Sequence, residues 1–451
     1  MVLSSKRHQI DMTSGAVLPK LLKFATPLIF SNLLQVLFHL ADTLVLGACS
    51  LDGAVGAVGS TSSLINLMLG LFVGLSMGAN VVVAKNIGAK KEEEVKQTIG
   101  MSILLSLIAG IFLLVIGLLF SKTFLIWMDC QPSRLADATS YMKIYFLGIP
   151  FSLLYNFSAS VMRASGDSLR PTMYITIGGV MNVLFNILFV AGFGMGVEGV
   201  AIATIISQAF AGICCFVTLI TSKTNICFRW KYFRIFKKQF KELIRIGLPS
   251  GIQGCLFSLS NVIIQSSINS FGDVVMDGSG YATHFDNIVY TVQNAIALSA
   301  MSFISQNVGA RNIKRVKSTT LISGATVMVV GISLGALAIL IVRPALGLIT
   351  TNQAVIDAAV VKVQYIAVPY FLCGLMEVLS YALRGIGKSL ISMIICVFGT
   401  CVFRIFWIYV ILPLHTTIEM LYTVYVISWI LTVILLAIGY IISIKKLERE
   451  I

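Results

Sequence analysis

Long apolar stretches alternate with short polar segments along almost the whole chain. Twelve stretches are long enough to cross a bilayer as helices, which takes about 20 residues each. They fall at about residues 20–46, 54–83, 98–120, 139–162, 171–191, 197–221, 241–269, 284–307, 319–342, 360–383, 391–412 and 420–444. Only helices and closed barrels satisfy their backbone hydrogen bonds in lipid, and the alternating segments of a barrel do not occur. The pattern predicts an all-α integral membrane protein with 12 transmembrane helices.

The composition agrees with this prediction. Of the 451 residues, 57% are hydrophobic and 12% are charged, and the mean hydropathy is +0.93. Soluble domains carry about 25% charged residues, so most of this chain must face lipid or other membrane helices. The first 17 residues are polar and lack the apolar core of a secretory signal, so the first apolar stretch is expected to be a retained span.

The positive charges are distributed unevenly between the two predicted sides of the membrane. One side carries 27 Lys and Arg residues and the other carries 5, including Lys362, while Arg404 lies inside a span. This asymmetry predicts that both termini are cytoplasmic and accounts for the net charge of +14 without nucleic acid. The basic segment at 222–240 is expected to be a cytoplasmic linker that touches anionic lipid headgroups.

Three short segments recur at an offset of about 221 residues, each at the same place in its six-span half. Residues 21–27 match 243–249, residues 85–90 match 306–311, and residues 163–169 match 384–390. Six spans per copy predict a parallel repeat with its axis along the membrane normal and a substrate cavity between the lobes. The predicted organisation is an N-terminal segment at 1–19, an N-lobe at 20–221, the linker at 222–240 acting as a hinge, a C-lobe at 241–444 and a tail at 445–451.

Proline and glycine positions add detail to the helices. Pro27 and Pro249 occupy matched places early in the first and seventh spans, where they indicate either a static kink or a point of bending. Gly70, Gly74 and Gly78 form a stripe of small residues that predicts close helix packing.

Polar residues inside the first half gather around one acid. Gln35, His39 and Asp42 lie on one face of the first span, and further polar groups follow in the fifth and sixth spans. The latter groups are Asn182, Asn186 and Thr204. A carboxylate among amide and hydroxyl oxygens can bind Na⁺ or exchange a proton, so we expect the coupling ion here. The alternative is a buried network that only fixes helix packing.

The second half contains its own set of intramembrane polar residues. Glu377 is expected to be either a counter-charge for substrate or a structural partner of Arg384. Asp286 is expected near the outer end of its span, within reach of water, and Arg404 requires an acid or carbonyl partner. The predicted lining of the substrate cavity comprises Glu377 and six further residues: Gln35, His39, Asn261, Gln265, Asn287 and Asn294.

With these features the chain resembles the MATE (multidrug and toxic compound extrusion) family, in its bacterial branch related to DNA-damage-inducible proteins. The resemblance covers about residues 15–445 and rests on three motifs: Leu40-Ala41-Asp42-Thr43, Ser305-Gln306-Asn307-Val308-Gly309-Ala310 with Arg315, and Arg163-Ala164-Ser165-Gly166-Asp167-Ser168. It implies export of organic, often cationic and amphipathic compounds by antiport with H⁺ or Na⁺ through alternating access. It also implies that Asp42 is the ion-site acid, with Asn182 and Thr204 as its partners and Pro27 as a bending residue.

Two departures from the family pattern bear on the coupling ion. Asn186 stands where the family often has an aspartate, and the span at 241–269 lacks the acid found in members that bind Na⁺ in the second lobe. Both differences favour H⁺ over Na⁺.

Proteins of other kinds fit the sequence less well. A lipid or polysaccharide-precursor flippase of the same superfamily would have extra spans or a basic central cavity, whereas Arg404 is the one basic residue expected within the spans. The G-x-G-x-x-G pattern at 194–199 lies between two spans without a βαβ context, so an enzyme is not expected. We expect no cofactor, membrane lipids and organic small molecules as partners, a monomer, and a bacterial plasma-membrane location.

Overall fold

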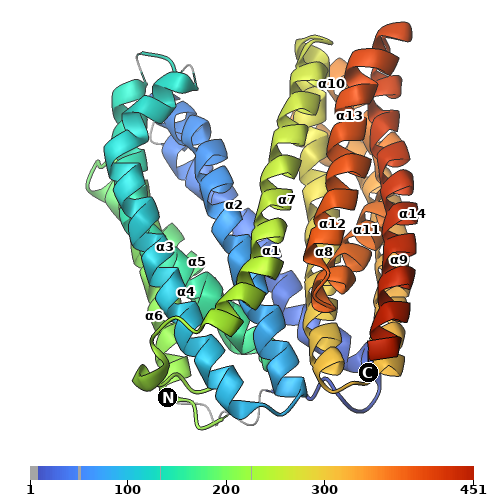
Figure 1. Ribbon diagram of the computed structural model, residues 1–451. Coiled ribbons are helices and arrows are strands. Elements are labelled where there is room, and N and C mark those ends of the chain that lie inside the picture. The colour runs from blue at the N-terminus through green and yellow to red at the C-terminus, as the bar shows by residue number, and fades with distance from the viewer. Residues whose placement is uncertain (1–8, 49–51, 129, 133, 225, 451) are drawn as a thin grey trace. The chain divides into compact units, whose positions relative to one another are not determined.

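The structure is a computed structural model that describes residues 9–48, 52–128, 130–132, 134–224 and 226–450. For residues 39–48, 52–60, 62, 63 and 66 it describes the backbone alone. The described chain consists mainly of helices joined by short turns and loops (Figure 1). Eleven helices are long and apolar enough to cross a membrane, and a bent helix pair brings the total to twelve if it counts as one span. The structure therefore agrees with the twelve spans predicted from the apolar pattern.

The chain divides into two compact units. The first contains the described residues up to Asp11 and Thr26–Gly251, and the second contains Met12–Ala25 and Ile252–Ile451. The boundaries therefore fall inside the first and seventh helices and not in the predicted linker. Pro27 is the second residue after one boundary, and Pro249 lies two residues before the other. Both helices are continuous through these prolines.

The helices of the first half run from α1 to α6 and are listed here. They are α1 (Val17–Ala48), α2 (Asp52–Gly88), α3 (Glu92–Trp127), α4 (Leu135–Ala164), α5 (Leu169–Asn186) with the π-helical turn η2 (Ile187–Gly192), and α6 (Val197–Thr221). Within the first unit, α4 packs against α2, α3 and α6, and α5 packs against α6 (Figure 1).

The helices of the second half follow a short 3₁₀ turn, η3 (Trp230–Tyr232). They are α7 (Lys237–Asn269), α8 (Asp273–Gly309), α9 (Ile313–Gly347), α10 (Gln353–Ile366), α11 (Tyr370–Gly385), α12 (Ser389–Cys396), η4 (Val397–Val402), α13 (Phe403–Phe406), η5 (Trp407–Ile411), η6 (Leu412–Leu414) and α14 (Ile418–Glu450). The bent pair is α10 and α11, which meet at 49° where a single span was predicted. Pro369 immediately precedes α11, and proline disfavours helical backbone in the residue before it.

The internal repeat is visible in the backbone. Lys90 and Arg311 are the two non-glycine residues with positive φ among the described residues, at 57° and 58°, and they lie at the repeat offset. Gly166 and Gly387 form a second pair at that offset, with φ of 95° and 81°. Positive φ is uncommon for residues with a Cβ atom, so its recurrence at matched turns indicates two copies of one helical scaffold.

The glycine stripe of α2 packs against the first half of α7 inside the first unit. A Cβ atom at Gly74 would lie 2.2 Å from the backbone nitrogen of Gly251, and one at Gly78 would lie 2.5 Å from the carbonyl oxygen of Leu243. Only glycine permits such backbone contact. This packing explains why α7 belongs to the first unit as far as Gly251.

The basic segment between α6 and α7 is folded onto the first unit. Ile226 and Phe228 are buried, and the amide of Phe228 donates to the carbonyl of Leu219 at 3.0 Å. Tyr232 packs against α3, where a Cβ atom at Gly100 would lie 2.3 Å from its carbonyl oxygen. The segment therefore differs from the simple hinge that was expected, because its apolar residues are part of the core of the first unit.

Residues of one family motif hold the chain before α1 in place within the second unit. The Arg315 side chain donates hydrogen bonds of 2.7–2.9 Å to the carbonyls of Met12, Ser14 and Gly15. The Asn307 amide also donates to the carbonyl of Met12, at 3.0 Å. The sequence showed that these motif residues belong together, but their role as anchors for the N-terminal segment is visible only in the structure.

Candidate functional site

The second unit encloses a cavity of about 410 Å³ between its helices. Its walls come from α7, α8, α10, α11, η4, α13 and α14. Five aromatic residues line it: Phe257, Tyr290, Tyr370, Tyr425 and Trp429. The polar lining includes Asn261, Gln265, Asn287 and Glu377, four of the residues predicted for a cavity. Aromatic side chains beside convergent polar groups are typical of small-molecule sites.

Asp286 and Lys362 form an ion pair at the cavity wall. Lys362 Nζ lies 3.5 Å from the Asp286 carboxylate, and the side chains of both residues are mostly buried. Lys362 also donates to the Thr283 hydroxyl at 2.7 Å and to the Ser279 carbonyl at 3.1 Å. The expectation that Asp286 simply reaches water is therefore wrong, and so is the counting of Lys362 as a loop charge. Each residue compensates the buried charge of the other.

Arg404 extends from α13 into the same cavity, where its side chain contacts three groups. Its Nε atom donates to the Ser428 hydroxyl at 3.1 Å, and one terminal nitrogen donates to the Asn261 amide oxygen at 3.4 Å. The guanidinium lies 4.6 Å from the ring centroid of Tyr425, a cation–π contact. The amide carbonyl of Asn261 is thus the kind of partner that the sequence required for Arg404.

Glu377 is the remaining acid of the cavity and is almost completely buried. It takes part in none of the seven ion pairs within 4.0 Å that the described residues form. Arg384, its alternative structural partner, has its guanidinium over the Tyr381 ring at 4.7 Å from the centroid. Glu377 lines the cavity and also interacts electrostatically with Arg384, so both predicted roles fit its position.

Asn294 lies one helical turn beyond the cavity lining on α8. Its amide donates to the hydroxyls of Tyr290 and Tyr381, each at 3.3 Å. It therefore positions the ring of Tyr290, which lines the cavity, and does not itself line it.

In the first unit, the polar residues of α5 and α6 meet as expected. The Asn186 amide donates to the Asn182 side-chain oxygen at 3.3 Å, and the Asn182 amide donates to the Thr204 hydroxyl at 3.3 Å. Thr204 in turn donates to the carbonyl of Val200 at 2.9 Å. Asn182 and Asn186 are buried, so these helices are joined by a chain of uncharged hydrogen bonds.

The first span supplies the remaining predicted residues. The Gln35 amide donates to the carbonyl and hydroxyl of Ser31, each at 3.3 Å, within α1. His39 and Asp42 belong to the same helix, but their side chains lie outside the part of the chain that the structure describes. The described residues contain no group of three or more His, Cys, Asp or Glu that could hold a metal ion.

Comparison with known proteins identifies a family model and related proteins that match most of the chain. The MatE family model matches the chain twice, over residues 27–188 and 249–410, so each half corresponds to one copy. The probable multidrug resistance protein YpnP of Bacillus subtilis is 30% identical over 307 residues, which cover 68% of each chain. The probable multidrug resistance protein NorM of Thermotoga maritima is 25% identical over 389 residues, covering 83% of this chain and 82% of NorM.

Solved structures agree with the predicted fold. A mutant form of the Vibrio cholerae MATE transporter VcmN superposes with a TM-score of 0.89 at 19% identity. The match covers 95% of this chain and 97% of VcmN. The prediction of an all-α, two-lobed membrane fold is confirmed.

Proposed function

Since the chain belongs to the MATE family, we propose that it is a secondary active exporter of organic, often cationic and amphipathic compounds. Cargo binds in the cavity of the second unit, and entry of H⁺ through the first unit drives export by alternating access. The names of YpnP and NorM, both probable multidrug resistance proteins, support the same class of activity.

The placement of Glu377 carries the proposal for a cationic cargo. The other charges of the cavity already have partners, Lys362 with Asp286 and Arg404 with Ser428 and Asn261. Glu377 forms no ion pair within 4.0 Å among the described residues, and Arg384 acts on it electrostatically. It lines the cavity beside aromatic faces that attract cations, so its carboxylate can receive an incoming cation.

The uncharged network of the first unit supports H⁺ as the coupling ion. Asn182, Asn186 and Thr204 offer neutral oxygen atoms, and Asp42 is the acid that the family resemblance assigns to this site. A Na⁺ site generally combines several oxygen ligands with negative charge. A proton needs only one titratable carboxyl, so the neutral network suits proton exchange at Asp42 better than Na⁺ binding.

The two-repeat architecture supports a monomer, the charge distribution supports cytoplasmic termini, and the family resemblance supports a bacterial plasma-membrane location. The protein acts as a monomer in a bacterial plasma membrane with both termini in the cytoplasm. It needs no cofactor and has no enzymatic activity.

The test uses everted membrane vesicles containing the full-length protein. We expect a fluorescent organic cation to accumulate, collapse of the pH gradient to abolish accumulation, and collapse of a Na⁺ gradient to leave it unchanged. Glu377→Gln should lower cation accumulation at least tenfold, whereas Asp357→Asn, at an exposed ion pair, should not. Accumulation that depends on Na⁺ alone would overturn the choice of ion, and equal accumulation by Glu377→Gln and the wild type would overturn the binding site.

The two basic residues of the cavity support a second candidate, a flippase for lipids or polysaccharide precursors. Lys362 and Arg404 are both buried, so the cavity contains more positive charge than the sequence indicated. An anionic headgroup could bind there if either residue exchanged its present partner. Movement of a fluorescent anionic lipid across proteoliposomes, with no transport of organic cations, would favour this function.

A further inference from the structure

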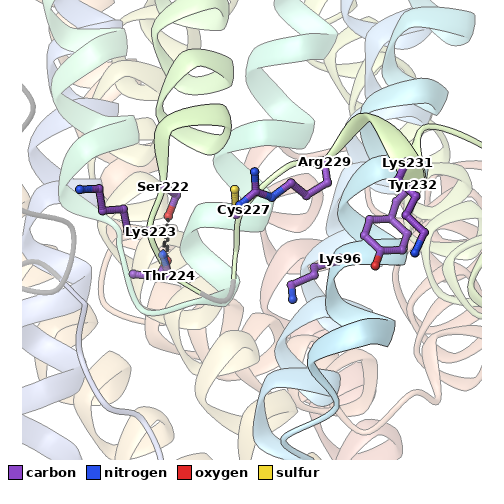
Figure 2. A pocket seen from close by; sticks show the side chains of 8 residues that line it. All are labelled: Lys96, Ser222, Lys223, Thr224, Cys227, Arg229, Lys231 and Tyr232. Atoms are coloured by element: carbon purple, nitrogen blue, oxygen red, sulfur yellow. Dashed lines mark hydrogen bonds between the residues drawn. The ribbon is translucent and has the colours of Figure 1, made fainter.

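A second pocket, of about 440 Å³, lies in the first unit where the segment between α6 and α7 folds against α3. Figure 2 shows its lining, which includes Lys96 of α3 and Arg229 and Tyr232 of the linking segment. Ser222, Lys223, Thr224, Cys227 and Lys231 complete it. The four charged residues of the lining are all basic, so the pocket has the electrostatic character of an anion site.

None of these four cations forms an ion pair within 4.0 Å in the described part of the chain. Three acids, Glu92, Glu93 and Glu94, lie in the first turn of α3, and two of them have partners other than the four cations. Glu94 pairs with Lys91 and Lys238, and Glu93 accepts a 2.8 Å hydrogen bond from the Tyr232 hydroxyl. The four cations of the pocket therefore lie beside acids of α3 without pairing directly with them.

Buried side chains join the described part of this segment to α6. Ile226, Cys227 and Phe228 are buried, and the Phe228 ring packs edge-on against Phe216 of α6. The hydroxyls of Ser222 and Thr224 are joined at 2.8 Å, as the dashed line in Figure 2 shows. The backbone that carries Arg229 and Lys231 is therefore held next to the pocket, and a bound anion would order their exposed side chains.

An apolar surface lies next to the cations. Trp230, between Arg229 and Lys231 in the chain, is 69% exposed, and Ile235 is 53% exposed. Exposed tryptophan beside basic residues is typical of segments at the membrane interface, where the ring meets the boundary between headgroups and acyl chains. A ligand that uses both features has a phosphate group and an apolar part.

We propose that this pocket binds the phosphodiester headgroup of an anionic phospholipid, with Lys96 and Arg229 on the phosphate and Trp230 against the glycerol and upper acyl region. A lipid bound there anchors the segment that leads into α7 to the headgroup layer. The site is separate from the cavity of the second unit and does not depend on what that cavity transports.

The test compares lipid binding to the full-length protein in detergent micelles by native mass spectrometry. We expect the wild type to retain phosphatidylglycerol in preference to phosphatidylcholine. The double variant Lys96→Gln/Arg229→Gln should bind phosphatidylglycerol roughly thirtyfold more weakly, corresponding to about 1 kcal/mol for each cation removed. Trp230→Ala should weaken phosphatidylglycerol binding as well.

The matched control removes the same charge elsewhere. Lys122→Gln/Lys143→Gln changes two exposed lysines, one near the other end of α3 and one on α4, and should leave lipid binding unchanged. Equal losses in the two double variants, or no loss in Lys96→Gln/Arg229→Gln, would overturn the site. Inorganic phosphate that binds as tightly as the lipid, with no effect of Trp230→Ala, would overturn the assignment to a lipid. Thermal unfolding of each variant verifies that it is folded.

Discussion

The two units place different chemistry on matched helices. In the first unit, Asn182 on α5 bonds to Thr204 on α6 without any charge. In the second unit, Tyr425 on α14 corresponds to Thr204 at the repeat offset, and Arg404 lies one residue from the match to Asn182. Arg404 and Tyr425 form a cation–π contact. The same pair of helices is thus joined by neutral hydrogen bonds in one copy and by a buried cation in the other.

This difference shows that one duplicated scaffold can support two sites of unlike polarity. The turns at Lys90 and Arg311, and at Gly166 and Gly387, keep the same backbone conformation in both copies. Turn geometry is determined by backbone sterics, whereas the polarity of a helix face depends only on its side chains. We therefore assign ion coupling to the first unit and cargo binding to the second as parts of one proposal.

The largest effect on stability is expected from breaking the buried pair of the second unit. Lys362→Met leaves the Asp286 carboxylate buried without its cation, which should cost about 3–5 kcal/mol in the free energy of unfolding. Chemical unfolding in micelles measures this loss. Arg343→Met breaks the exposed pair with Asp357 and should cost less than about 1 kcal/mol. Similar losses for the two variants would show that Asp286 and Lys362 are not coupled.

A smaller loss in the free energy of unfolding is expected from substitution of Arg404. Arg404→Lys keeps the charge but cannot reproduce the planar set of donors that reaches Ser428 and Asn261, so it should cost about 1–3 kcal/mol. The exposed Arg311→Lys should cost less than about 0.5 kcal/mol in the same unfolding assay. If Arg404→Lys lowered the free energy of unfolding no more than this control, the hydrogen-bond geometry of Arg404 would contribute nothing to stability.

The smallest effect is expected in the neutral network of the first unit. Thr204 and Thr221 both lie on α6, and each donates to the carbonyl four residues earlier, but Thr204 also accepts a hydrogen bond from Asn182. Thr204→Val should therefore cost about 1 kcal/mol more than Thr221→Val. An equal cost for both valine variants would contradict a structural link between α5 and α6 at this point.

The sequence predicted most of the fold because membrane spans depend on local apolar length. The repeat was found by matching short segments, and the spacing of the glycines around Gly74 predicted a close helix contact but not its partner, Gly251. The family resemblance implied that Asn182 and Thr204 belong to one site, where they are hydrogen-bonded. The break between α10 and α11 was missed because the apolar stretch continues through Pro369. The π-helical turns within the fifth and eleventh spans have no signal in the apolar pattern.

Local sequence patterns did not predict which distant residues form contacts. Lys362 was counted as a loop charge because it lies at the edge of an apolar stretch, and nothing near it in the sequence indicates Asp286 as a partner. The folding of the basic segment onto α3 was also missed. Its many charges indicated a solvated linker, although Ile226 and Phe228 within it are buried. Contacts between distant residues require the structure, or many related sequences, to be seen.

The assignment of ion coupling to the first unit and cargo binding to the second is tested most directly in the purified, reconstituted protein. Cargo binding and proton-driven transport are measured separately. We would measure equilibrium binding of a fluorescent organic cation, and its transport driven by a pH gradient, for Glu377→Gln and Asp42→Asn. The prediction is that Glu377→Gln loses binding and transport together, whereas Asp42→Asn keeps binding and loses transport. Loss of binding by Asp42→Asn, with normal binding by Glu377→Gln, would contradict the assignment of cargo to the second unit.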